Sequence, residues 1–247
     1  MFKEMLKTFT FGTLYALSAG KNKGIGAVLL YHSINNKDVF YQQMLYLKKK
    51  FRFVLAKDIQ TEMAKAKKGE NFICCTFDDG DLSNYDNALP VLKALDIKAT
   101  FFIAASLLGK YIERRPMMTI DQVHRLSLMG HEIGAHTMTH PMLTKILIDK
   151  AQEEILQSKI YLEKLIGSSV VSFAYPYGDF NDMICGITKD VGFKYGFITK
   201  EGLLNSKVAS QFKLPRISIE ENFNFIHFRS KVSLALEYYE LLRGRKL

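Results

Sequence analysis

The chain has 247 residues, 48% of them hydrophobic and 24% charged, which is enough to bury the core of one large α/β domain. Its three cysteines do not make a disulfide framework, and no stretch approaches the roughly 20 apolar residues of a membrane-spanning helix. The net charge of +9 favours a polyanionic neighbour. Because no nucleic-acid-binding motif accompanies the basic clusters, we expect no nucleic-acid partner.

Residues 1–24 are the candidate for a targeting or anchoring segment. Lys3 and Lys7 precede a short apolar region that ends in small residues, a weak secretory pattern without a clean cleavage site. We therefore expect an uncleaved helix that either lies on an anionic membrane surface or packs against the domain of residues 25–247. The expected location is cytoplasmic, peripheral at the inner membrane in the first case, with secretion as the alternative.

Short apolar runs alternate with helical patterns along the rest of the chain. The runs are rich in β-branched and aromatic residues and predict strands at 27–32, 72–77, 99–104, 132–136, 170–175, 195–199 and 214–219. A helix is predicted from Ile148 to Ile166, ending at Gly167, and another begins at the capping-box sequence of residues 119–122. About seven strands alternating with helices predict parallel pairing, in either a (β/α) barrel or a doubly wound sheet.

Acidic and imidazole side chains follow two of these predicted strands. Asp78 and Asp79 close the run 72–77 before a glycine, which taken alone fits an ordinary strand-ending turn. His136 and His140 lie in the sequence GAHTMTHP at the end of another run. In a barrel, catalytic residues sit where strands end, so the four side chains are expected to meet.

The four-residue spacing of His136 and His140 places both imidazoles on one face if the segment turns helically. Pro141 would then suit the first turn of the next helix. Two histidines and one carboxylate are a known ligand set for a catalytic Zn²⁺ with an open position for water. A second, neighbouring aspartate can take a proton from that water.

The joint pattern resembles the polysaccharide deacetylase family of NodB-like, metal-dependent carbohydrate esterases, in particular its shorter members. The resemblance runs from about Val28 to Arg216 and rests on TFDDG at 76–80, HTMTH at 136–140 and YPYG at 175–178, supported by LLYHSI at 29–34 and IKATFFI at 97–103. It implies a distorted (β/α) barrel and a hydrolase that removes N-acetyl groups from a sugar in a polysaccharide or glycolipid.

Carried onto the matching positions, the resemblance implies a catalytic base at Asp78 and metal ligands at Asp79, His136 and His140. It also implies that the backbone N–H of Tyr177 binds the oxyanion. The expected cofactor is a divalent metal, Zn²⁺ first and Co²⁺ or Ni²⁺ as alternatives. The expected partners are an N-acetylated or lipid-linked glycan and, through the basic N-terminal segment, an anionic membrane surface.

Two departures from the family pattern affect the catalytic assignment. The third motif commonly begins with an arginine that steadies the catalytic aspartate, and Ala174 stands there instead. From its place in the last predicted strand, Arg216 is our candidate replacement. The late Leu-x-His motif has no clear counterpart, because His227 lies in a predicted helix where a packing role is expected. These departures motivate a second hypothesis, a glycan-binding pseudoenzyme of the same fold.

The remaining candidate residues are assigned to substrate binding or to structural roles. His32 ends the first predicted strand and either lines the same rim or has a structural role. Tyr175 and Pro176 of the third motif are assigned to substrate binding, where Tyr175 would stack on a sugar ring, with packing as the alternative. His131 is expected to pack or cap at a strand start, and His124 to lie on the surface of a helix.

Overall fold

The computed structural model describes residues 24–66, 69–112, 114–204, 210–220 and 224–233, together with Thr13. The predicted N-terminal helix, apart from Thr13 and Gly24, therefore lies outside the described residues. Among the helices that are described, none combines the length and the apolar character needed to cross a bilayer.

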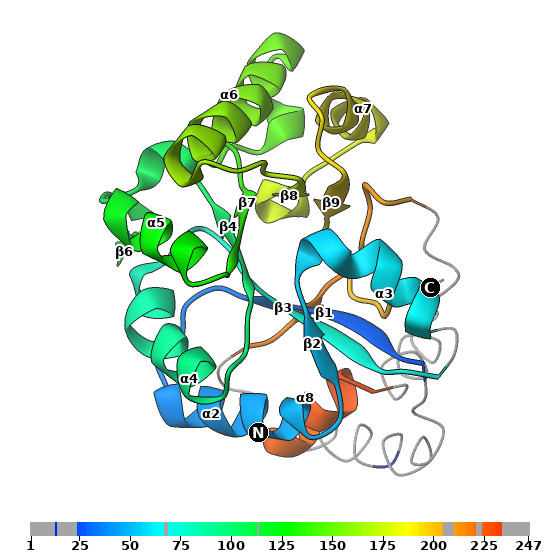
Figure 1. Cartoon of the computed structure of the whole chain (residues 1–247). Helices are drawn as coiled ribbons and strands as arrows, with labels where there is room; N and C mark the ends of the chain where they lie inside the picture. The colour runs from blue at the N-terminus through cyan, green and yellow to red at the C-terminus, as the bar shows by residue number, and fades with distance from the viewer. Residues whose placement is uncertain are drawn as a thin grey trace, which may run out of the picture.

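A curled, parallel sheet forms the centre of the molecule (Figure 1). Its strands lie in the order β10 (Ile217–Ser218), β1 (Gly26–Tyr31), β3 (Phe72–Phe77), β4 (Thr100–Ile103), β7 (Glu132–Ala135), β8 (Ser172–Ala174) and β9 (Tyr195–Phe197). All neighbours on this path pair in parallel. This arrangement confirms the distorted (β/α) barrel, and each of these strands falls within or beside a predicted run.

One strand was not predicted from the sequence. β2 (Arg52–Val54) pairs with the first half of β3, while β4 pairs with the second half of the same edge. It has only three residues and Arg52 is exposed, so it lacks the apolar run that marks the other strands. A separate antiparallel hairpin, β5 (Tyr111–Ile112) and β6 (Arg115–Pro116), was also not predicted.

Helices surround the sheet (Figure 1): α2 (Lys37–Lys48), α3 (Ile59–Ala66), α4 (Leu89–Ala94), α5 (Ile120–Leu128), α6 (Ile148–Ile166), α7 (Asp182–Asp190) and α8 (Phe225–Lys231). α6 has the predicted bounds and ends at Gly167, whose φ of 68° is left-handed. The capping box at the start of α5 is also present. Local sequence signals therefore fix where these two helices begin or end.

The alternation of side chains along the strands divides the core in two. In β3, Ile73, Cys75 and Phe77 pack in the larger cluster with residues of α2, α4, α5 and α6. Phe72 and Cys74 join the smaller cluster on the concave side, with residues of α3. The three cysteines are free and buried, as expected for core packing in a chain without a disulfide framework.

Residues 214–218 close the sheet between β9 and β1. Leu214 forms a parallel bridge with Phe197 of β9, and Ile217 pairs with Leu29 of β1. Arg216 lies between these two contacts, so barrel closure directs its side chain to the barrel interior, where it is fully buried.

Candidate active site

The polar residues predicted from the sequence meet at the carboxyl ends of the strands. Asp78 and Asp79 follow β3, and His136 follows β7, with β4 between these two strands. All three side chains are buried, and His140 is half-buried on the loop after β7. The sheet topology thus confirms that residues about 60 positions apart in the chain share one end of the barrel.

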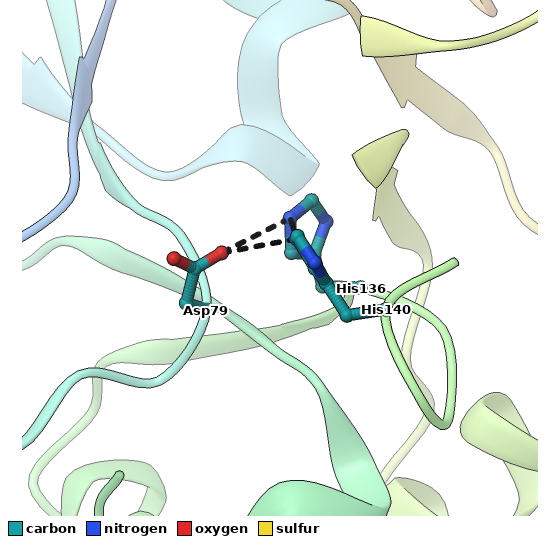
Figure 2. Close-up of side chains that lie close together, drawn as sticks. All are labelled: Asp79, His136 and His140. Carbon is teal, nitrogen blue, oxygen red and sulfur yellow. Dashed lines mark hydrogen bonds and ion pairs between the residues drawn. The ribbon is translucent and has the colours of Figure 1, made fainter. Parts of the chain in front are cut away.

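Asp79, His136 and His140 present three ligand atoms to one point (Figure 2). Asp79 Oδ1 lies 3.2 Å from His140 Nε2 and 3.5 Å from His136 Nε2. The two Nε2 atoms lie 3.2 Å apart. In a tetrahedral site with bonds of about 2.1 Å, donor atoms are about 3.4 Å apart, so this triangle fits a metal ion such as Zn²⁺.

The orientation of His136 also fits a metal ligand. Its Nδ1 lies 2.7 Å from the carbonyl oxygen of Ala174, which can only accept a hydrogen bond. Nδ1 therefore carries a proton, so in the neutral ring that binds a metal the lone pair lies on Nε2, which points toward Asp79 and His140. A backbone carbonyl that fixes the tautomer in this way is the usual support for a metal-ligating histidine.

The loop that carries the histidines is not helical, so the helical arrangement considered for the sequence is wrong. Thr137 and His140 have left-handed φ values of 64° and 62°, and Thr137 Oγ1 accepts a hydrogen bond from the His140 N–H at 3.0 Å. The next elements are η4 (Leu143–Lys145) and α6, so Pro141 does not open a helix either.

The carboxylate of Glu154, in α6, is hydrogen-bonded to this loop. It accepts hydrogen bonds from the backbone N–H of Met138 at 2.9 Å and of Thr139 at 2.8 Å. It also accepts one from the Thr139 hydroxyl at 2.8 Å. A helix that packs on the sheet thereby fixes a loop whose two left-handed residues would otherwise be unfavourable.

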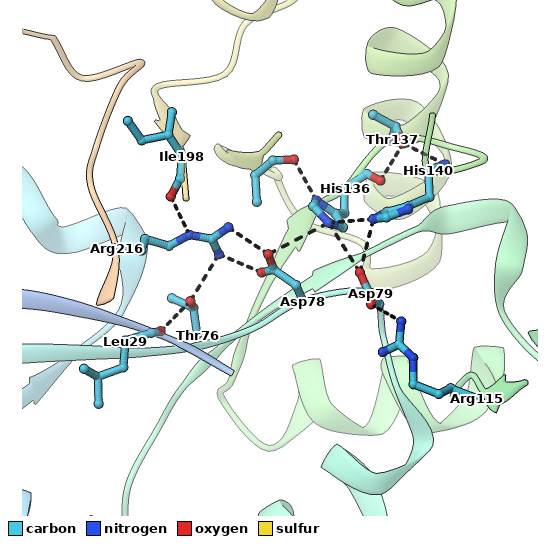
Figure 3. A network of polar contacts seen from close by, with 11 residues as sticks. Leu29, Thr76, Asp78, Asp79, Arg115, His136, Thr137, His140, Ile198 and Arg216 are labelled. Atoms are coloured by element: carbon cyan, nitrogen blue, oxygen red, sulfur yellow. Dashed lines mark hydrogen bonds and ion pairs between the residues drawn. The ribbon is translucent and has the colours of Figure 1, made fainter. Parts of the chain in front are cut away.

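Arg216 forms a bidentate ion pair with Asp78 (Figure 3). Nη1 and Nη2 of the guanidinium donate to Oδ1 and Oδ2 of Asp78, both at 2.7 Å, and Nε donates to the carbonyl of Ile198 at 3.1 Å. Burial would raise the pKa of the Asp78 carboxyl, but the charges of Arg216 and His136 outweigh it and lower that pKa. Asp78 is therefore a carboxylate, and Arg216 occupies the place proposed for it.

The metal-binding triangle carries strong electrostatic coupling. Burial would raise the pKa of Asp79, yet hydrogen bonds from His136 and His140 hold it well below its usual range. Burial would lower the pKa of His136, yet the carboxylates of Asp78 and Asp79 raise it. The cluster thus favours bound positive charge, whether a proton or a metal ion.

Arg115 was missed by sequence analysis. It reaches Asp79 from β6, with Nη2 2.7 Å from Asp79 Oδ2, while Nη1 lies 3.3 Å from Asp81 Oδ2. Asp81 in turn accepts hydrogen bonds from Ser33 and Ser83. No spacing in the sequence marks Arg115, because the unpredicted hairpin brings it to the site.

Tyr177 lies at the mouth of the site. Its φ of 58° is left-handed, its side chain is 53% exposed, and its ring centroid lies 4.7 Å from that of His140. His32 is exposed just after β1, where the preceding carbonyl of Tyr31 accepts the Asp78 N–H at 3.0 Å. It therefore lies beside Asp78 and contributes to lowering the pKa of that carboxyl.

The assignment of Tyr175 and Pro176 to substrate binding is wrong for this structure. Tyr175 is 0% exposed, and its hydroxyl donates to the carbonyl of Phe212 at 3.1 Å. It shares the outer face of its strand with Phe173, whose ring lies 5.2 Å away. Pro176 is buried as well. Both residues therefore pack behind the loop and present no surface to a sugar.

The other histidines have the structural positions expected of them. His131 is buried at the start of β7, and its Nδ1 accepts a hydrogen bond from the Ala99 N–H at 3.2 Å. His124 is exposed on α5. His227 is buried in α8, whose Phe225 and Phe228 pack on Tyr46 of α2. His227 is thus buried in a helix that packs on α2, as expected for a packing residue.

Comparison with known proteins agrees with this geometry. The model of the family described as polysaccharide deacetylase matches residues 65–196. A poly-beta-1,6-N-acetyl-D-glucosamine N-deacetylase of Staphylococcus aureus (strain MRSA252) is 28% identical over 194 residues, which cover 74% of this chain and 67% of that protein.

Two solved structures are similar over most of their length. The Streptococcus pyogenes deacetylase PplD, in complex with acetate, gives a TM-score of 0.73 at 26% identity, covering 80% of this chain and 93% of that one. IcaB from Ammonifex degensii gives a TM-score of 0.70 at 26% identity, covering 81% and 94%. The family match includes both aspartates and both histidines of the site, whereas Arg216 lies beyond it.

Proposed function

Because the chain belongs to the polysaccharide deacetylase family, we propose that it hydrolyses the N-acetyl groups of an N-acetylated glycan with a divalent metal held by Asp79, His136 and His140. The observation that carries the proposal is the meeting of this ligand triangle with Asp78. Asp78 Oδ2 lies 3.9 Å from His136 Nε2, so the ionised carboxylate borders the triangle without belonging to it.

The metal, when bound, would polarise the amide carbonyl and promote ionisation of the attacking water. Asp78 would take a proton from that water. Its lowered pKa keeps it ionised at neutral pH, and the two hydrogen bonds from Arg216 hold its oxygens in place. The base is therefore oriented before substrate arrives.

The backbone N–H of Tyr177 is our candidate donor to the oxyanion that forms as water adds to the carbonyl. The contact of the Tyr177 ring with His140 supports this role, because it places the Tyr177 residue next to the ligand triangle. His32, exposed just after β1, would contact the sugar. Collapse of the tetrahedral adduct would break the C–N bond, with the nitrogen taking up the proton that Asp78 removed from water, and would release acetate and a free amine.

Arg216 also bears on the pseudoenzyme hypothesis. That hypothesis rested in part on Ala174, where the family commonly has the arginine that steadies the base. In this chain a buried arginine just before β10 donates hydrogen bonds to both oxygens of Asp78. The base is thus supported without the usual motif residue, which favours a catalytic role.

The named relative supports a proposal for the substrate class. The Staphylococcus aureus protein acts, by its name, on poly-beta-1,6-N-acetyl-D-glucosamine. We therefore propose a polymer of N-acetylglucosamine, with a lipid-linked N-acetylated sugar as the alternative. Zn²⁺ is our first choice of metal because the donor triangle suits a tetrahedral ion, and Co²⁺ and Ni²⁺ suit the same nitrogen and oxygen donors.

The test is release of acetate from β-1,6-linked N-acetylglucosamine oligomers, followed by the loss of acetyl mass per sugar. We expect turnover that a chelator abolishes and that added Zn²⁺ or Co²⁺ restores. His140→Ala should lose bound metal and turnover together, whereas His124→Ala, an exposed histidine on α5, should keep both. Full metal content and full turnover in His140→Ala would refute the site.

A further inference from the structure

Arg115 is the one charged side chain that joins the β5–β6 hairpin to Asp79 within the described part of the chain (Figure 3). Its guanidinium contacts Asp79 Oδ2 at 2.7 Å and Asp81 Oδ2 at 3.3 Å. The Arg115 side chain is 31% exposed, whereas those of Asp79 and Asp81 are 3% and 4% exposed. A partly exposed cation therefore covers two buried carboxylates.

The main chain fixes the position of this arginine. Just after β6, the N–H of Met118 donates to the carbonyl of Gly80 at 2.8 Å, and Met117 forms an antiparallel bridge with Asp81. The segment that follows Arg115 is thus paired with the turn that contains Asp79. The ion pair depends on a backbone register as well as on a flexible side chain.

The two oxygens of Asp79 have different partners. Oδ2 accepts from Arg115, and Oδ1 faces the Nε2 atoms of His136 and His140. Asp79 itself has a left-handed φ of 71°, a conformation that an aspartate adopts at some cost unless its surroundings hold it. A partial rotation of the carboxylate, or a change of the Asp79 rotamer, would break both sets of contacts.

We propose that Arg115 is a positioning residue that holds Asp79 with Oδ1 toward the metal. The proposal rests on the proposed function, because it concerns the same ligand triangle. Arg115 does not touch the reacting atoms, and it acts through Asp79. Supports of this kind to a metal ligand are typically worth about 10- to 100-fold in metal affinity.

The direction in which metal affinity changes when Arg115 is substituted distinguishes a positioning role from a purely electrostatic one. A guanidinium close to a divalent cation repels it, so removal of the charge alone would tighten metal binding. Loss of positioning would weaken binding, because Asp79 could then turn away from the histidines. A substitution at Arg115 therefore moves the metal affinity in opposite directions under the two accounts.

The experiment measures Zn²⁺ affinity of the full chain by competition with a chelating indicator. Arg115→Met keeps most of the side-chain volume and should weaken Zn²⁺ binding about 10- to 100-fold. Arg115→Lys keeps the charge and one donor and should recover part of the loss. The matched control is Arg114→Asn, which removes an exposed arginine one residue away and suits the left-handed φ of 74° at that position.

A spectroscopic readout tests the geometry directly. At saturating Co²⁺ the visible absorption bands report the arrangement of ligands, so Arg115→Met should shift them while Arg114→Asn should not. Should Arg115→Met fail to fold, Arg115→Lys carries the test, with Zn²⁺ affinity and Co²⁺ bands between those of the wild type and a His136→Ala variant.

Tighter or unchanged Zn²⁺ binding in Arg115→Met, or in Arg115→Lys where that variant carries the test, would overturn the positioning role. Failure of the proposed function has a different signature. In that case the wild-type chain itself would bind Zn²⁺ no better than His136→Ala does. The two failures are therefore distinguished by the wild-type measurement.

Discussion

Arg216 and Asp78 form a buried, bidentate ion pair, with both N···O distances at 2.7 Å. They are 138 residues apart in the chain. The arginine comes from the segment that closes the sheet, whereas the family commonly supplies it from the third motif. The ion pair with the aspartate is thus made by an arginine from a different part of the chain.

This pair predicts a strong coupling between the two residues. Arg216→Met leaves the Asp78 carboxylate buried and unpaired, which should lower the free energy of unfolding by about 3–5 kcal/mol. Asp78→Asn removes the unpaired charge. The free energy of unfolding of the double variant should therefore fall by less than the sum of the losses in the two single variants. Denaturant unfolding of the four metal-free proteins measures the coupling. Additivity within about 0.5 kcal/mol would contradict it.

Asp78 and Asp79 should separate into base and ligand. Asp78→Asn removes the proton acceptor and should keep bound metal while kcat falls by roughly 10²-fold or more. Asp79→Asn removes an anionic ligand and should lose the metal. Metal content and steady-state turnover are measured on the same preparations. The opposite pattern, with metal lost from Asp78→Asn and kept by Asp79→Asn, would exchange the two roles.

Glu154 should support the histidine loop from behind. Glu154→Ala removes the acceptor for two backbone N–H groups, so Zn²⁺ affinity should fall by about 10-fold. Glu154→Gln keeps an oxygen acceptor and should stay near the wild type. Glu153→Ala, which removes the adjacent exposed carboxylate of the pair with Lys150, serves as the control. An equal loss of Zn²⁺ affinity in both alanine variants would contradict a supporting role for Glu154.

His131 should make stability depend on pH below neutrality. Burial and the positive charge of Lys98 leave its pKa at about 4, below its usual 6.5, so the folded protein holds a neutral ring. The unfolded chain binds the proton first as the pH falls. The resulting contribution is complete above about pH 6.5 and is lost toward pH 4, by up to about 3 kcal/mol.

The His131→Asn variant isolates this contribution. The asparagine amide oxygen can accept the Ala99 N–H in place of Nδ1 but does not titrate. Urea unfolding at several pH values should therefore show the wild type losing more stability than the variant between pH 6.5 and 4. Parallel pH profiles for the two proteins would refute the assignment.

The N-terminal segment carries a separate prediction. In the helix predicted for residues 1–24, which lie outside the described residues apart from Thr13 and Gly24, Phe2, Met5, Leu6 and Phe9 would share one face, with Lys3 and Lys7 outside it. We propose that this helix binds an anionic membrane surface, where each basic residue contributes about 1 kcal/mol. Co-sedimentation should show binding to anionic but not neutral vesicles, weakened by salt and by deletion of residues 1–20. Equal recovery of both proteins in the supernatant would favour a packing role.

Much of the fold was predictable because its signals are local. The apolar run 72–77 became β3 without a change of bounds, and the helix 148–166 ends at a glycine that supplies the left-handed residue. The motif residues could be placed at one end of the barrel because parallel strands point the same way. Their contact then follows from topology rather than from spacing.

Other parts depend on tertiary contacts that carry no local signal. β2 is too short and too polar to predict, and Arg115 reaches Asp79 through a hairpin whose sequence has no marked pattern. The loop of His136 and His140 contains two left-handed residues, and Thr137 Oγ1 and the Glu154 carboxylate support it by accepting hydrogen bonds from its backbone N–H groups. Helical spacing alone could not show this.

Tyr175 is a different kind of error, because the sequence does carry the relevant signal. Phe173 and Tyr175 are two residues apart and share one face of the strand, where both pack in the outer core. Ala174 between them faces inward, with its side chain in the concave cluster. The alternation of side chains along the strand is therefore sufficient to assign Tyr175 to packing.

The closing segment 214–218 gives the site an order of assembly. A growing chain that has emerged as far as β9 already contains Asp79, His136 and His140, so it has the donors to capture metal. It still lacks Arg216, whose guanidinium donates hydrogen bonds to both oxygens of Asp78. On the proposed function, the chain therefore contains all its metal ligands before the residue that holds its base, so a chain that ends before residue 214 would lack part of its catalytic machinery.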